Sequence, residues 1–264
     1  MSDEDVVPNW LRDHMIRSID GESSWAVHIK RVRTRVCESC NGRMNRSLEM
    51  PAQGLVTAMW DGAKLQLDYA GARNVAAWVV KVQTLYSLMR HWRNDAAPAV
   101  HPDGAATWSA EQSESIHRDD LQRLIEHGRL PPATTICALY MAAKDRSAPL
   151  GIRSDPQHRG YSATNLMPLM FEMVYRDYEP GLHSSARGLD ARWVQLWPLK
   201  RDATVTWPPA LATSVLDVID YQAENIRRAH FMTMGADRAA STGWLQLAKT
   251  YEELGVSRSI IDWV

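Results

Sequence analysis

Two cysteines three positions apart, at the end of a basic stretch, place the tightest constraint on this chain. Cys37 and Cys40 form a C-x-x-C pair, and two thiolates at this spacing can hold one tetrahedral metal ion. A structural zinc site needs four ligands, and the remaining cysteine, Cys137, lies far along the chain. The sequence therefore presents half of a metal site. A redox pair and two thiols near a turn are the alternative interpretations, although no βαβ pattern surrounds the pair.

Length, charge and cysteine usage bound the class of protein. The chain has 264 residues, which is enough for one large domain or two modest ones. Its net charge is -1, so a nucleic-acid partner requires a local basic patch. Three cysteines do not indicate a disulfide framework and favour a reducing compartment. The acidic start and the lack of a long apolar run predict a cytoplasmic protein with no membrane partner.

Hydrophobic spacing predicts the elements of the first part of the chain. Apolar residues recur at three- and four-residue spacing over residues 72–93, which gives the strongest helical pattern. Shorter helices are predicted at 6–16, opened by Pro8, and at 41–49. Residues 25–37 alternate with one slip, as two short strands or one bulged strand would.

The second part of the chain mixes strands and helices. Residues 94–115 have a loop-like composition, and a short helix near 118–127 is predicted to stop at Gly128. The predicted strands are 134–142, 166–175 and 191–197, with a loop at 153–162; the predicted late helices are 213–228 and 236–254. Helices, then strands, then helices indicate an α+β fold. The expected division is 1–94, a loop or linker at 95–117, and a larger mixed α+β region at 118–264.

Several short motifs, taken in order, resemble a known family. They are residues 2–11 (SDEDVVPNWL), 37–41 (CESCN), 48–49 (LE), 78–81 (WVVK) and 192–198 (RWVQLWP). This order and spacing resembles a branch of the HNH endonucleases, mainly over residues 2–90. The resemblance implies a small ββα unit, built around a catalytic divalent cation such as Mg²⁺ or Mn²⁺ and followed by a helical segment. It also implies phage or bacterial settings.

The resemblance assigns roles by position. Glu4 corresponds to the metal carboxylate, Asn41 to the helix ligand, and Cys37 and Cys40 to half of a structural zinc site. Asp5 stands at the catalytic position where the family has histidine, and a carboxylate with an ordinary pKa near ~4 is a weak base for activating water. The family's upstream C-x-x-C is not in this sequence, so a longer chain, another cysteine, a histidine or a second subunit in a homo-oligomer would complete the zinc site.

These departures predict an HNH-like protein that is catalytically weakened or inactive and that binds DNA. The basic residues expected to face nucleic acid are Arg31, Arg33, Arg35, Arg43 and Arg46. An active metal-dependent HNH endonuclease and a non-catalytic protein-interaction module are the alternatives. Taken alone, each of these features also has a simpler interpretation. The basic run is then a solvated face, and residues 3–5 are a frayed acidic terminus.

Overall fold

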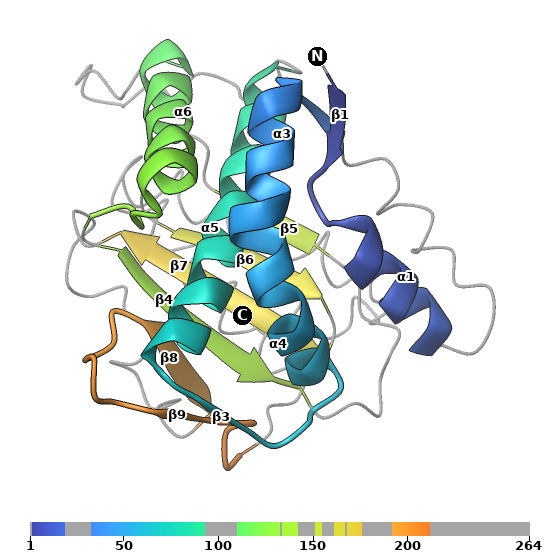
Figure 1. The fold of residues 1–264 in the computed structure, drawn as a ribbon, viewed down its shortest axis with the longest axis vertical. Coiled ribbons are helices and arrows are strands. Elements are labelled where there is room, and N and C mark those ends of the chain that lie inside the picture. Colours follow the sequence, from blue (N-terminus) through green and yellow to red (C-terminus); the bar gives the residue numbers. More distant parts are fainter. Residues whose placement is uncertain are drawn as a thin grey trace, which may run out of the picture.

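The protein is described here by a computed structural model, in which a long central helix lies across a five-stranded sheet (Figure 1). The described residues are 2–18, 33–92, 110–132, 134–141, 151–154, 161–166, 168–175 and 192–211. Helices and strands both occur throughout them, so the predicted α+β class is confirmed.

The first two strands form an antiparallel pair, although residues 6–32 separate them in the chain; we call this pair the hairpin. β1 (Ser2–Asp5) pairs along its whole length with β2 (Arg33–Val36). β2 alternates exposed and buried residues, as a strand does when one face is exposed to solvent and the other packs against the core. The acidic start is therefore a strand, and its interpretation as a frayed terminus is wrong. Residues 19–32, including part of the predicted strand region, lie outside the described residues.

One helical segment follows the hairpin and contains a π-helical turn. It comprises α3 (Glu38–Met44), η1 (Asn45–Glu49) and α4 (Met50–Trp60). Pro51 accounts for the wide turn, because proline has no N–H to donate and its ring crowds the carbonyl of the preceding turn. The N–H of Met50 bonds instead to the carbonyl of Asn45. The helix predicted at 41–49 is confirmed as part of this longer segment.

Proline and glycine set two helix boundaries as predicted. α1 (Asn9–Ser18) follows Pro8, whose carbonyl accepts the first backbone hydrogen bonds. α6 (Ala110–His127) ends at Gly128, which has a φ of 60°. α6 begins well before residue 118, so the last part of the predicted loop or linker at 95–117 is helical.

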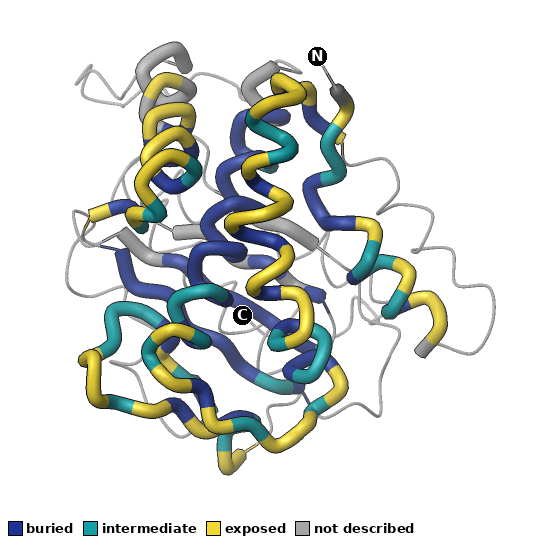
Figure 2. The backbone as a smooth tube through the Cα atoms, viewed as in Figure 1, coloured by how far each residue is buried: buried dark blue, intermediate teal, exposed yellow. Residues whose placement is uncertain are grey.

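α5 (Tyr69–Trp92) is the central helix, and it confirms the helix predicted at 72–93. It lies between the α3–α4 segment and the sheet, and α6 packs beside it (Figure 1). The helix is buried over most of its length, as the dark blue of Figure 2 shows. Lys81, Gln83 and Thr84 are buried among its apolar residues. Polar groups enclosed in this way need partners, which makes them informative.

The large sheet is antiparallel with the order β5-β6-β7-β4-β8. Its strands are β4 (Thr134–Tyr140), β5 (Gly151–Ser154), β6 (Tyr161–Leu166), β7 (Leu169–Tyr175) and β8 (Trp193–Trp197). β4, β7 and β8 confirm the three predicted strands. β5 and β6 occupy the ends of the segment predicted as a loop at 153–162, so that prediction is wrong there. A separate pair joins β3 (Leu65–Leu67) to β9 (Val205–Trp207).

One hydrophobic cluster connects these elements within the described residues. It runs from Val6 beside the hairpin through Trp78 of α5 to Phe171 of the sheet, where the rings of Trp78 and Phe171 have centroids 5.8 Å apart. Residues before and after the predicted loop or linker at 95–117 therefore contribute to one hydrophobic core. No described helix is both long enough and apolar enough to span a membrane. The helices predicted at 213–228 and 236–254 lie outside the described residues.

Candidate functional site

The hairpin and the helix after it gather the residues of the sequence motifs. Glu4 and Asp5 end β1, Cys37 caps α3, and Cys40 and Asn41 lie within α3. The backbone N–H of Asn41 bonds to the carbonyl of Cys37 at 2.9 Å. In chain order the elements are β1, α1, β2 and α3, so the paired strands lead into a helix as in a ββα unit, but α1 stands between the two strands.

A buried charge cluster, formed by Lys81, Glu4 and Glu49, lies where the hairpin meets α5. The ammonium of Lys81 is fully buried and donates to Glu4 Oε1 at 2.7 Å and to Glu49 Oε1 at 2.5 Å. It also lies 3.5 Å from the carbonyl oxygen of Asp5. A lysine ammonium has three N–H donors, so these three acceptors satisfy it. The cluster fastens β1 and η1 to the central helix.

The electrostatic balance of this cluster shows in the pKa of Glu4. Burial removes water from the carboxylate and raises its pKa above the ordinary value of 4.5. The attraction and hydrogen bond of Lys81 act in the opposite direction, while the nearby Glu49 adds to the rise. Glu4 and Glu49 share one ammonium, and that ammonium stabilises the ionised form of Glu4 in this largely buried position.

Asp5 is held by two arginines. Its Oδ1 accepts a hydrogen bond from Arg33 Nε at 2.9 Å, and its Oδ2 lies 3.5 Å from Arg12 Nη1. The side chains of Asp5 and Arg12 are only 11% and 12% exposed, so water and salt screen their attraction less than at an open surface. Both oxygens of the carboxylate at the predicted catalytic position therefore face guanidinium groups.

These contacts test whether a divalent cation fits at Glu4 and Asp5, and it does not. A Mg²⁺ or Mn²⁺ ion bound to Glu4 would displace the fully buried ammonium of Lys81 from its acceptor. At Asp5 the ion would stand beside two guanidinium groups, and like charges repel. Both predicted ligands are already neutralised by the protein's own cations.

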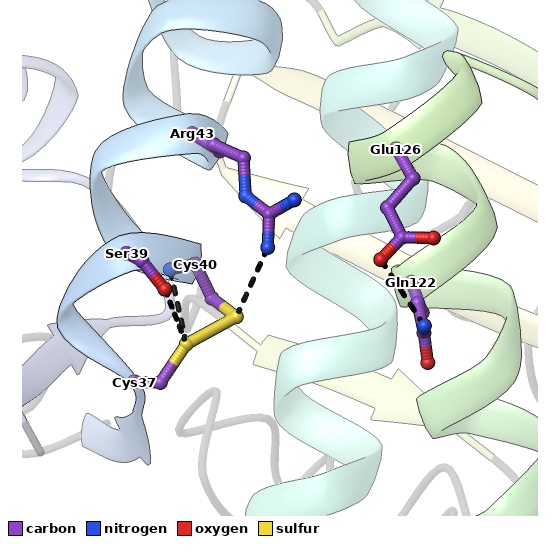
Figure 3. The surroundings of a disulfide bond; sticks show 6 residues. All are labelled: Cys37, Ser39, Cys40, Arg43, Gln122 and Glu126. Atoms are coloured by element: carbon purple, nitrogen blue, oxygen red, sulfur yellow. Dashed lines mark hydrogen bonds between the residues drawn. A yellow bond between two sulfur atoms is a disulfide. The ribbon is translucent and has the colours of Figure 1, made fainter.

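The C-x-x-C pair forms a disulfide at the start of α3 (Figure 3). Cys37 is exposed and Cys40 is half-buried, with Cα atoms 5.2 Å apart. The backbone N–H of Cys40 donates to Cys37 Sγ at 3.0 Å, and the Ser39 hydroxyl lies 3.3 Å from the same sulfur. Arg43 Nη2 lies 3.9 Å from Cys40 Sγ. The pair could supply two zinc ligands when reduced, but no described group of three or more His, Cys, Asp or Glu side chains is placed to hold a metal.

The predicted basic residues divide into two groups. Arg33 and Arg35 are exposed on β2, but β1 places Asp5 and Asp3 opposite them. Cross-strand pairs of opposite charge attract each other, so the hairpin is less positive than the sequence suggested. Arg43 and Arg46 are exposed on the helical segment. Together with the exposed Cys37 and the half-buried Cys40 they form what we call the exposed rim; Arg31 lies outside the described residues.

Sequence reasoning missed two residues that shape the site. Lys81 ends the motif at residues 78–81, and one lysine within a long apolar helical stripe is itself a signal of a buried ion pair. Nothing in the sequence joins Arg12 to Asp5, so this contact emerges only from the fold. A further contact, His14 Nε2 to Asp61 Oδ1 at 2.8 Å, links α1 to the end of α4 across 47 positions.

Comparison of the chain with protein-family models, with curated proteins and with solved structures gives no match.

Proposed function

We propose that this chain is an HNH-like nuclease-fold protein whose ββα unit binds DNA and is catalytically weakened or inactive. A cytoplasmic location accords with such a partner. The antiparallel pairing of β1 with β2, which leads into α3 with Asn41 near its start, supports the relationship, although α1 stands between the two strands in the chain.

The observation that carries the loss of catalysis is the engagement of Glu4 and Asp5. Glu4 pairs with the buried Lys81, and Asp5 with Arg12 and Arg33. A general base must accept a proton from water, and both oxygens of the Asp5 carboxylate already face guanidinium groups, which leaves them poorly placed for that role. We infer that these residues stabilise the fold.

The exposed arginines support DNA as the partner. Arg43 and Arg46 project from one helical segment whose inner face, with Met44, Leu48 and Glu49, is buried. Guanidinium groups bind phosphate oxygens through paired N–H donors, and such contacts position a protein on a nucleic-acid backbone without reading its sequence. Binding of this kind is expected to weaken steeply as salt rises.

The test compares two double variants by fluorescence anisotropy with a labelled DNA duplex. Arg43→Ala with Arg46→Ala removes the proposed contacts, and Arg17→Ala with Arg201→Ala removes two exposed arginines elsewhere, so the net charge of the two variants is the same. The first variant should lower the slope of log K against log salt by about 2, since each phosphate contact contributes about 0.9. Equal effects of both variants, or no binding by the parent protein, would refute DNA binding by this face and leave the protein-interaction module.

A further inference from the structure

The Cys37–Cys40 disulfide is placed where it can react, and it does little to hold the fold together. Both cysteines belong to the first turn of one helical segment, so the bond joins no two separate elements. A crosslink over so short a loop restricts the unfolded chain far less than one that closes a long loop. Cys37 is exposed to solvent, which gives external thiols access to its sulfur.

The groups around the two sulfurs favour thiolates. Cys37 Sγ receives the backbone N–H of Cys40 at 3.0 Å, and the Ser39 hydroxyl lies within hydrogen-bond reach. Cys40 Sγ lies 3.9 Å from the Arg43 guanidinium, as Figure 3 shows. Hydrogen-bond donors and a nearby cation stabilise negative charge on sulfur, and the thiolate is the reactive form in disulfide exchange.

We propose that Cys37 and Cys40 are a redox-active pair that exchanges with low-molecular-weight thiols. An external thiolate attacks the exposed Cys37 Sγ and forms a mixed disulfide. The bond between the two protein sulfurs breaks, and its electron pair goes to Cys40 Sγ, where Arg43 stabilises the leaving thiolate.

A second external thiolate then attacks the sulfur of the bound thiol and releases Cys37 as a thiolate. Two molecules of the external thiol are oxidised to one disulfide, and the protein disulfide is reduced to two thiols. The reverse sequence reoxidises the pair. The exchange reaction requires no DNA, and although Arg43 takes part in both proposals, thiol exchange and DNA binding are measured separately, so either proposal can fail alone.

Cys137 provides an internal control. It lies on β4 with only 3% of its surface exposed, and it stands outside the disulfide. A buried thiol reacts slowly with external reagents. Alkylation of the folded protein should therefore report the state of Cys37 and Cys40 and leave Cys137 unmodified until the protein is denatured.

The experiment equilibrates the full chain in glutathione buffers that range from fully reduced to fully oxidised. The protein is then alkylated and its free thiols are counted by mass, with its zinc content measured on the same samples. We expect the two thiols to appear and disappear together and reversibly. A disulfide that no buffer reduces, thiols that no buffer oxidises, or stoichiometric zinc that protects both thiolates would each overturn the proposal.

The rate of reduction by dithiothreitol tests the part assigned to Arg43. Arg43→Ala should slow reduction roughly threefold or more, because the leaving thiolate loses its cation. Arg17→Ala, on exposed α1 surface, should reduce at the parental rate. Equal rates in the two variants would contradict the role of Arg43 in stabilising the leaving thiolate, with circular dichroism checking that both are folded.

Discussion

The buried charge cluster and the exposed rim meet on one helical segment, which supplies Glu49 to the cluster and all residues of the rim, but they differ in what their charges can do. η1 turns Glu49 inward against Lys81, whereas Arg43 and Arg46 point to solvent. Buried charges are costly to leave unpaired, so each is committed to a partner inside the protein. Exposed charges lose little when they exchange water for a ligand. Burial, more than residue type, separates the structural carboxylates of this unit from its available groups.

The largest effect should come from removing the shared cation. Lys81→Met leaves the buried Glu49 and the part-buried Glu4 without their shared cation and should lower the free energy of unfolding by about 3–5 kcal/mol at neutral pH. Urea denaturation measures this loss. Part of the stability should return as the pH falls, because protonation removes the repulsion. Lys64→Met, at an exposed position, should change stability by less than about 0.5 kcal/mol, and equal losses in both variants would contradict the cluster's role.

A smaller effect should separate two aspartates that contact the same arginine. Asp5 and Asp13 both lie near Arg12, but their side chains are 11% and 56% exposed. Asp5→Ala should cost about 2 kcal/mol, because it leaves the part-buried guanidinium without this partner. Asp13→Ala should cost at most about 0.5 kcal/mol, as for other surface pairs. Thermal or urea denaturation measures both losses of stability. A larger loss for Asp13→Ala than for Asp5→Ala would contradict the distinction between buried and exposed charges.

Glu4→Gln should have a mild effect whose size depends on pH. Since burial raises the pKa of Glu4, the folded protein binds this proton more tightly than the unfolded chain does. The resulting stabilisation is present at low pH and is lost as the pH rises from 4.5 through the raised pKa. Glutamine does not ionise and can still accept from Lys81, so the variant should gain stability relative to the parent as pH rises. Denaturation at several pH values measures the difference in free energy of unfolding between variant and parent. If the parent instead gains stability relative to the variant as pH rises, the attraction of Lys81 outweighs burial.

The smallest effect on stability should come from the rim. Arg43→Ala with Arg46→Ala should stay within about 0.5 kcal/mol of the parent, because both side chains are exposed. The same variant should have a large effect on DNA binding. A thermal unfolding experiment that shows a loss above about 1 kcal/mol would place these arginines with the structural group instead.

Local patterns predicted the elements whose cause is local. The three- and four-residue spacing of apolar residues predicted α5, and Gly128 with its positive φ marked the end of α6. The hairpin of β5 and β6 was missed because its segment is polar and offers no apolar alternation to detect.

The candidate site was less predictable because its contacts are long-range. Lys81 meets Glu4 across 77 positions and Glu49 across 32, and only the packed fold brings them together. The aspartates opposite Arg33 and Arg35 follow from the register of β1 with β2, which the composition of the basic run does not contain. The motifs named several of the right residues, but their roles depend on partners that the motifs do not specify.

Nicking of supercoiled plasmid tests the central claim most directly. The full chain is incubated with plasmid in Mg²⁺, Mn²⁺ or EDTA, beside an Asn41→Ala variant. Because Glu4 and Asp5 are held by the protein's own cations, we predict no nicking with either metal above the EDTA control. Nicking that requires metal and disappears in Asn41→Ala would contradict this account and establish an active HNH-type endonuclease.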